Sequence, residues 1–449
     1  MNLRVRRGSL RWLMPGMQVK RWVLVLVAGI TLFGLGCAYL LRDIYDARPL
    51  PLVFYYLTLQ FIPRWGRALL FGSVGCALIV MGLVRMNQAL LAPFVHPGQE
   101  KVVDALYRHR RRQRGPKVVA IGGGTGLSVL LRGLKEHTDH LTAIVTVADD
   151  GGSSGRLRQE LGVLPPGDFR NCIAALSEAE GLTSRLFQYR FGEGVGLNGH
   201  SFGNLFIVAM AEVTGSFEQA LVESSRVLAV RGQVLPSTVQ NVTLCADLLE
   251  EQPGPGEEAG WRRVEGESSI TKQLGTIERV FLEPEEVLAY PAAVKAILEA
   301  DLIIAGPGSL YTSVLPNLLV GDVTRAIQAS QALKVYVCNV ATQSGETDGY
   351  GVGDHMRAIQ KHVGPGLVHT VLANDRFLGP VAAPSGAQWV QLPQEGDEDS
   401  GYQLVTADLV DEEFPWRHDP HKLAHHVMAL YEAWVKEPTQ GGFSQSASG

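Results

Sequence analysis

Two glycine-rich turns carry the residue types best suited to holding an anion. The first turn spans 122–126 and the second spans 149–155, and each follows an apolar run, at 117–121 and 141–147. Leucines at 127, 130, 131 and 134 continue the first turn with helical spacing. A strand, a glycine turn and a helix N-terminus together present backbone N–H groups to an anion. The residues expected at phosphate in the first turn are Gly122, Gly123, Gly124, Thr125 and Gly126.

The second turn opens on two adjacent carboxylates, Asp149 and Asp150. Such a pair can hold Mg²⁺ against a diphosphate, because that ion keeps several waters and uses one or two carboxylates. Asp149 also lies 23 residues past Gly126, close to the spacing of a ribose-binding carboxylate in dinucleotide folds. Ser153 and Ser154 could supply hydroxyl donors to an anion nest. An ordinary acidic turn is the alternative interpretation.

Three later stretches are polar and flanked by glycine, at 165–171, 306–313 and 342–347. The first contains Arg170, a cation suited to phosphate, next to Asn171. The other two follow the apolar runs 302–305 and 335–340. Loops at the carboxyl ends of parallel strands bind ligands in open α/β sheets. The two glycine turns and the stretches 306–313 and 342–347 all follow apolar runs, and these four strand-end loops predict one shared cleft.

Several familiar motifs are not supported by their context. The first turn lacks the Gly-Lys-Ser/Thr of a P-loop, and 199–203 matches G-x-S-x-G without a strand before it. Ser201 is better interpreted as the start of a helix over 202–213. His421 and His425 lack the glutamate of a zinc-protease helix. The five cysteines form no C-x-x-C pair, which argues against a disulfide framework or structural zinc.

The elements that must position these loops alternate along the chain. Apolar runs at 117–121, 141–148, 302–305, 334–340 and 368–373 are separated by helical patterns, which predicts an α/β fold with three layers and a mostly parallel sheet over 117–436. The stretch 169–249 is expected to form a mainly helical subdomain. Loops are predicted at 250–267 and 394–401, a final helix through 423–434, and a disordered tail at 437–449.

The first part of the chain has a different composition. Residues 1–117 carry 18 Lys and Arg against 4 Asp and Glu, whereas the remainder carries 22 against 41. Uncharged or apolar runs at 22–41 and 68–84 are long enough to cross a bilayer as helices. Basic residues flank them in 1–21 and in the linker 85–116, which predicts a two-helix transmembrane hairpin with both termini and the main domain cytoplasmic. A cleaved signal ending near Cys37 is the alternative.

The basic cluster at 108–114 is interpreted as a contact with lipid headgroups at the inner face of the cell membrane, and no nucleic-acid partner is expected.

Six motifs taken together resemble the gluconeogenesis-factor (YvcK-like) family, which is related to the 2-phospho-L-lactate transferases (CofD-like) of deazaflavin cofactor synthesis. The resemblance covers roughly 115–435. The motifs are 121–126, 147–156, 164–171, 199–204, 306–319 and 342–347 with Asp354-His355. In the last motif this chain has Ala341 and Ser344 where the family usually has Met and Pro. The amino-terminal hairpin lies outside the shared domain, as in a membrane-anchored subgroup.

The resemblance implies a Rossmann-like fold that binds a nucleotide: a UDP-sugar or a dinucleotide in the regulatory branch, a guanosine nucleotide in the transferase branch. It places the first glycine turn at phosphates and Asp149 with Asp150 at ribose or Mg²⁺. The remaining cleft would be lined by Asn171, Asn204, Gly308, Ser309, Tyr311 and Thr312. The regulatory branch is tied to growth on gluconeogenic carbon, to cell shape and to envelope synthesis.

We therefore expect a membrane-anchored cytoplasmic sensor of a UDP-sugar, more regulatory than enzymatic, that acts through an unidentified envelope-synthesis protein, with homo-oligomers allowed. One alternative is a Mg²⁺-dependent phosphotransferase acting on a nucleotide diphosphate such as GDP. The other is an NAD(P)-dependent oxidoreductase, suggested by the spacing of Asp149.

Overall fold

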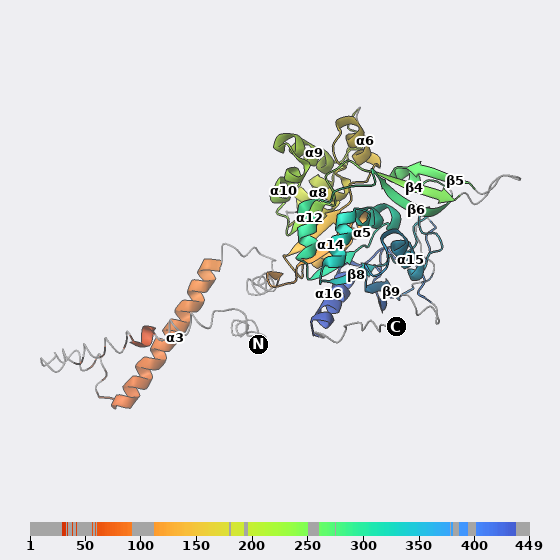
Figure 1. Ribbon diagram of the computed structural model, residues 1–449. Coiled ribbons are helices and arrows are strands. Elements are labelled where there is room, and N and C mark those ends of the chain that lie inside the picture. The colour runs from red at the N-terminus through yellow and green to blue at the C-terminus, as the bar shows by residue number, and fades with distance from the viewer. Residues whose placement is uncertain are drawn as a thin grey trace. The chain divides into compact units, whose positions relative to one another are not determined.

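The structure is a computed structural model in which the chain divides into two compact units, residues 1–111 and 112–449 (Figure 1). The described residues are 29–32, 34, 38, 42, 56, 59, 61–91, 112–178, 181–192, 196–249, 260–273, 275–377, 379, 386–393 and 401–436.

The main described element of the first unit is α3, Arg64–Leu91, a helix of 28 residues that exposes apolar side chains such as Leu69 and Phe71. Within the described residues, no helix taken singly has both the length and the apolar composition to cross a bilayer. The predicted membrane hairpin is therefore not supported by the structure. Its first span, 22–41, lies almost wholly outside the described residues, and its second, 68–84, lies inside α3. The start of the predicted linker is also helical, because α3 continues to Leu91.

A parallel sheet of seven strands forms the centre of the second unit, in the order β10-β9-β8-β7-β1-β2-β3. The strands are β1 Val118–Gly122, β2 Leu141–Val145, β3 Gln233–Pro236, β7 Leu302–Ala305, β8 Leu333–Val337, β9 Thr370–Asn374 and β10 Gln403–Ala407. Every residue of β1, β2, β7, β8 and β9 is buried, as expected for a parallel sheet covered on both faces. The predicted α/β class with a mainly parallel sheet is confirmed.

The strand order reverses between β1 and β7. From β1 the chain moves outward through β2 to β3, then returns to pair β7 against the other edge of β1, with Val118 opposite both Leu141 and Leu302. Loops that leave two neighbouring strands in opposite directions open a crevice at the carboxyl edge of the sheet. This topology positions the loops after β1 and β7 on the two sides of one crevice.

Helices pack in groups around the sheet (Figure 1). In the first group, α5 (Gly124–Leu134) packs against α7 (Gly167–Leu176) and α16 (Pro420–Lys436), and its four leucines at helical spacing are fully buried. A second group joins α12 (Pro291–Leu298) to α14 (Gly321–Ala329). The remaining helices are α6 Gly152–Leu161, α8 Gly181–Gln188, α9 Phe202–Thr214, α10 Phe217–Val227, α11 Glu267–Ile270, α13 Leu315–Leu318 and α15 Val352–Val363, with a π-helical turn η3 at Leu310–Val314.

A separate antiparallel sheet, in the order β5-β4-β6, differs from expectation. Its strands are β4 Thr243–Leu249, β5 Trp261–Glu265 and β6 Thr276–Glu283. The stretch 169–249 is helical only through α10, because its last residues form β3 and β4. The predicted loop 250–267 contains the edge strand β5, whose exposed charged residues resemble a loop in composition.

Candidate functional site

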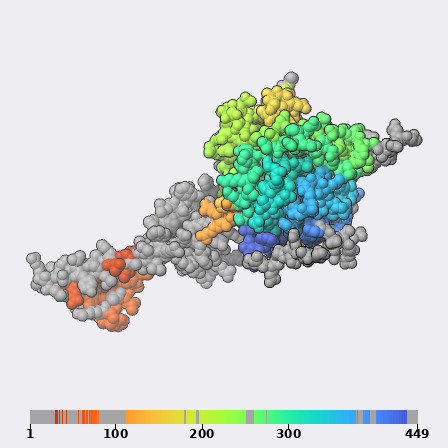
Figure 2. Space-filling model, viewed as in Figure 1, coloured from red at the N-terminus to blue at the C-terminus, as the bar shows by residue number. Residues whose placement is uncertain are grey.

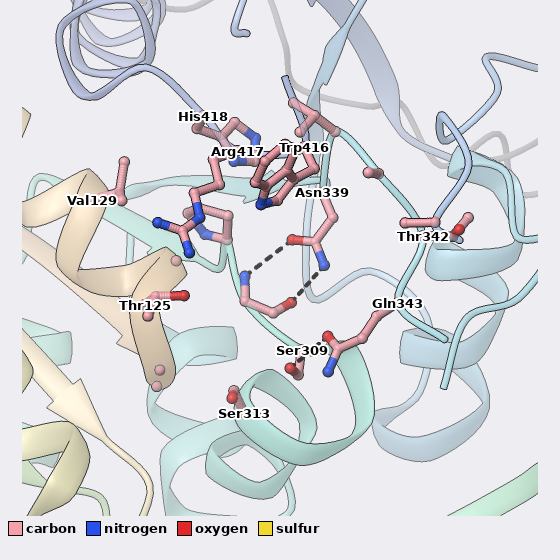
Figure 3. A pocket seen from close by; sticks show the side chains of 18 residues that line it. Thr125, Val129, Ser309, Ser313, Asn339, Thr342, Gln343, Trp416, Arg417 and His418 are labelled. Carbon is pink, nitrogen blue, oxygen red and sulfur yellow. Dashed lines mark hydrogen bonds between the residues drawn. The ribbon is translucent and has the colours of Figure 1, made fainter. Parts of the chain in front are cut away.

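A cleft of about 330 Å³ lies at the carboxyl edge of β1, β7 and β8 (Figure 3). The glycine loop, by which we mean Gly123 and the first turn of α5, supplies Gly123, Gly124, Thr125 and Gly126, and the loop after β7 supplies Gly308 and Ser309. The other polar residues that line the cleft are Ser313, Asn339, Thr342, Gln343, Trp416, Arg417 and His418. The reversal of strand order thus produces a single cleft from loops far apart in the sequence.

The glycine loop after β1 is packed closely against the loop after β7. A Cβ atom at Gly126 would lie 2.5 Å from the carbonyl oxygen of Pro307, so only glycine fits there. Gly123 is the N-cap of α5 and provides no side-chain hydrogen bond to the helix. The helix start therefore faces the cleft with backbone donors that its N-cap residue does not occupy, an arrangement that favours an anion.

Asn339 holds the loop after β7 in place. Its Oδ1 accepts from the Gly308 N–H at 3.1 Å, and its Nδ2 donates to the Gly308 carbonyl at 2.9 Å (Figure 3). Next to it, the Ser309 hydroxyl donates to Gln343 Oε1 at 2.6 Å, and Gln343 Nε2 donates to Glu346 at 3.0 Å. Hydrogen bonds between the loop after β7 and the loop after β8 therefore hold this polar part of the cleft in place.

Asp168, at the start of α7, lies directly behind the glycine loop. Its Oδ2 accepts from the Gly124 N–H at 2.7 Å. Burial and, second to it, the neighbouring Asp149 raise the pKa of Asp168 to about 6, against the lowering effects of the Gly124 bond and Arg170. A carboxylate thus occupies one donor at the α5 N-terminus and titrates close to neutrality.

Two glutamates extend this acidic region. Glu346 is buried, and burial raises its pKa to about 7 despite hydrogen bonds from Thr312 Oγ1 and the Tyr311 N–H. Glu267 in α11 has a pKa raised well above its usual value, first by burial and then by Asp149, Asp168, Glu346 and Asp150. Glu267 therefore lies close enough to carboxyl groups from three other chain segments for them to disfavour its ionisation.

Asp149 and Asp150 are both bonded to the backbone. Asp149 Oδ1 accepts from the Gly151 N–H, and Asp150 Oδ1 accepts from the Ser268 N–H, each at 2.8 Å. Burial raises the pKa of Asp149, with Asp150 as a further cause. Among the described residues, no group of three or more His, Cys, Asp or Glu is arranged to hold a metal ion. The magnesium role expected for the pair stays a prediction.

Ser153 belongs to a buried network rather than to the cleft surface. Its hydroxyl lies 3.0 Å from His200 Nδ1 and accepts from Asn204 Nδ2 at 3.1 Å. Asn204 is 1 % exposed, and its Oδ1 has no hydrogen-bond partner. Arg170 donates to Ser201 Oγ at 2.6 Å and to Asn171 Oδ1 at 2.8 Å. This network ties the start of α6 to α7 and α9.

The expected site residues therefore fall into two sets. Seven of the sixteen candidates belong to the second turn or its partner network and are absent from the cleft lining: Asp149, Asp150, Ser153, Ser154, Arg170, Asn171 and Asn204. Tyr311 and Thr312 were expected to line the cleft, but η3 turns them inward. Tyr311 is buried and its hydroxyl lies 2.8 Å from Tyr350, while Thr312 donates to Glu346.

Ser201 does start α9, since its side chain accepts from the Asn204 N–H as an N-cap.

Arg417 is the cleft residue that sequence reasoning missed most clearly. It lies in the segment before α16, its guanidinium faces the side where Thr125 and Val129 lie, and it forms no ion pair with a described residue (Figure 3). Trp416 and His418 flank it, and burial lowers the pKa of His418 to about 4, which keeps that ring neutral. No glycine turn precedes these residues, so only their packing reveals them.

Comparison with known proteins matches the family model of 2-phospho-L-lactate transferase CofD to residues 118–410. The gluconeogenesis factor of Bacillus subtilis is 48% identical over 326 residues, which cover 70% of this chain and 98% of that protein. A provisionally named gluconeogenesis factor of a Nostoc species is 48% identical over 431 residues, 94% of this chain and 92% of that protein.

A crystal structure of a upf0052-family protein from Bacillus halodurans has the same fold. It superposes with a TM-score of 0.65 at 46% identity, and the match covers 70% of this chain and 99% of that one. The two shorter relatives thus correspond to most of the second unit, whereas the Nostoc protein also matches much of the first.

Proposed function

This chain belongs to the gluconeogenesis-factor family and carries a CofD-like domain, and on that premise we propose that its β1–β7 cleft binds a nucleotide diphosphate, as in a UDP-sugar. One observation carries the proposal: the N-terminus of α5, where Asp168 takes one backbone donor, opens at the reversal of strand order, opposite Arg417, which forms no ion pair with a described residue. Helix N-terminal amides together with an arginine make a suitable site for a diphosphate.

The rest of the cleft suits the nucleoside. Ser309, Thr342 and Gln343 place hydroxyl and amide groups along one wall, and Trp416 places an aromatic side chain beside Arg417 (Figure 3). Hydroxyl and amide groups fix the orientation of a sugar or base edge, and an indole ring offers a stacking surface. A volume of about 330 Å³ admits part of a nucleotide and leaves the remainder at the opening.

Isothermal titration calorimetry of the full-length protein tests this proposal. We expect UDP-glucose or UDP-N-acetylglucosamine to bind more tightly than GDP, NAD or NADP. Arg417→Gln should weaken binding by about tenfold, since one charge-assisted contact with phosphate is lost. Arg226→Gln, on the exposed surface of α10, is the matched control and should bind like wild type. Failure of all these nucleotides to bind would reject the proposal.

A transferase is the second candidate, because the matching family model is named for one. In that case Asp150→Asn should abolish Mg²⁺-dependent turnover of a nucleotide diphosphate, while a sensor would show altered affinity and no turnover in either form. If the protein is a sensor, nucleotide binding in the cleft would act as a switch on a protein partner in envelope synthesis. If it is a transferase, the cleft would be a catalytic site.

We further propose a location at the inner face of the cell membrane. The support is the sequence itself: the uncharged run 22–41, the apolar part of α3 and the basic residues on either side. Cell fractionation should place the full chain with membranes and a variant lacking 1–111 with the supernatant. Equal distribution of the two forms would reject this location.

A further inference from the structure

A second cleft, of about 360 Å³, lies where α6 meets the small antiparallel sheet. None of its residues lines the nucleotide cleft. In the space-filling view, α6 and the strands β4–β6 lie at the surface next to each other (Figure 2). We call it the Asp150 cleft, and its polar side chains are Asp150, Arg158, Gln159, Asn241, Thr243 and Glu265.

The backbone around Asp150 is shaped to hold its carboxylate in this cleft. A Cβ at Gly155 would lie 1.8 Å from the Asp150 carbonyl oxygen, and a Cβ at Gly266 would lie 2.0 Å from Asp150 Oδ2. Gly266 also has φ +90°, a conformation that other residues rarely adopt. With Oδ1 bonded to the Ser268 N–H, the carboxylate is fixed between α6 and the end of β5.

Charges of both signs line the Asp150 cleft without pairing. Arg158 is half-buried, and its Nη2 donates to Asn241 Oδ1 and to the Val242 carbonyl, each at 2.5 Å. Neither Arg158 nor Asp150 takes part in an ion pair within the part of the chain that the structure describes. The cleft thus presents one guanidinium, two carboxylates, two amides and a hydroxyl to the same space.

This donor set suits a ligand that both donates and accepts hydrogen bonds. Two carboxylates against one guanidinium leave the cleft with net negative charge, which disfavours an anion. A hydroxyl group both donates and accepts, so a ring bearing several hydroxyls can satisfy carboxylates, amides and guanidinium together. We propose that the Asp150 cleft binds a neutral, hydroxyl-rich ring of the sugar class. In one case the ring belongs to a sugar that is linked to the nucleotide in the first cleft, and this case rests on the function proposed above. In the other case it belongs to a free sugar, and that case is independent of the proposed function.

The test compares UDP-glucose, UDP and glucose on the full-length protein by calorimetry, with hydrogen exchange as a second readout. The test variant is Gln159→Ala with Glu265→Ala, two exposed residues whose removal leaves Asp150 and Arg158 in place. The control is Glu160→Gln, which is exposed on α6 and does not line the cleft. Peptides 152–161 and 261–266 report occupancy of the Asp150 cleft, and peptide 122–126 reports the first cleft.

We expect the sugar-bearing ligand to protect peptides 152–161 and 261–266. Its affinity should fall about tenfold in the test variant, remain unchanged in the control, and UDP should bind all three forms equally. An effect on UDP-glucose alone identifies a linked sugar, and an effect on glucose identifies a free one. If neither ligand protects these peptides or responds to the variant, the proposal is overturned, whether or not UDP binds. Loss of UDP binding alone would instead reject the nucleotide proposal.

Discussion

Asp168 accepts a hydrogen bond from Gly124, the kind of backbone donor that a phosphate uses at a helix N-terminus. Asp149 and Glu267 interact with it, Glu346 interacts with Glu267 in turn, and burial raises the pKa of all three. A bound diphosphate would meet negative charge on this side and positive charge at Arg417. At the scale of single residues, the protonation of these carboxyl groups therefore sets how strongly an anion binds.

Binding of UDP-glucose should become tighter as the pH falls through about 6. The pKa of Asp168 is raised to about 6, with Asp149 and Arg170 as its charged neighbours, so its charge disappears below that pH. Removing one like charge near a diphosphate is expected to gain about tenfold in affinity between pH 8 and pH 5. The diphosphate diester of UDP-glucose does not titrate in this range.

Calorimetry across this range on wild type and Asp168→Asn measures the effect. The asparagine keeps an acceptor for the Gly124 N–H, so its affinity should be high and constant with pH. A variant that retains the full pH dependence of the wild type would assign the effect to another group.

Glu346 should make the folded protein less stable at high pH. Its pKa rises from 4.5 to about 7 on folding, so its contribution to stability is present below pH 4.5 and is lost as the pH rises through 7. The full difference corresponds to about 3 kcal/mol. Glu346→Gln should remove this dependence, as measured by urea unfolding at pH 5 and pH 8. The exposed Glu212→Gln on α9 should behave like wild type, and parallel curves for wild type and Glu346→Gln would contradict the assignment.

At the scale of elements, a glycine in the first turn of α5 allows that helix to pack against the segment that follows β7. Gly126→Ala places a Cβ 2.5 Å from the Pro307 carbonyl oxygen, although alanine otherwise favours a helix. We expect a loss of about 1–3 kcal/mol in the free energy of unfolding and a loss of nucleotide binding. Thermal unfolding and calorimetry measure the two effects. Gly181→Ala at the start of α8, where a Cβ contacts nothing, should be neutral, and equal effects at both positions would exclude the steric cause.

The sequence was sufficient for the elements that have strong local patterns. The leucines of α5 and the β-branched runs of β1, β2 and β7 are buried as predicted, because period and composition agree there. It was not sufficient for β4, where only Asp247 interrupts an apolar run, or for β5, which is charged and gains order by pairing with β4. Arg417 and the inward turn of Tyr311 depend on long-range packing, which no local pattern records.

At the scale of the molecule, the second unit should fold without the first. The two units separate at Arg111, and the Bacillus relatives correspond to the second unit over nearly their whole length. A chain of residues 112–449 should unfold cooperatively within about 2 °C of the full-length protein by circular dichroism, a shift worth under roughly 1 kcal/mol. An aggregated or non-cooperative product would show that the first unit supports the fold.

The position of β1 in the interior of the sheet, between β7 and β2, has a consequence for synthesis on the ribosome. Its partner β7 begins 184 residues later, and Arg417 follows more than 100 residues after that. At roughly 5–20 residues per second, the glycine loop waits about 15–60 s before the chain that completes its cleft has been translated. During that interval the β7 edge of β1 has no partner. We therefore expect a chaperone to bind the nascent protein at this unpaired edge. The ligand can bind only after translation is nearly complete.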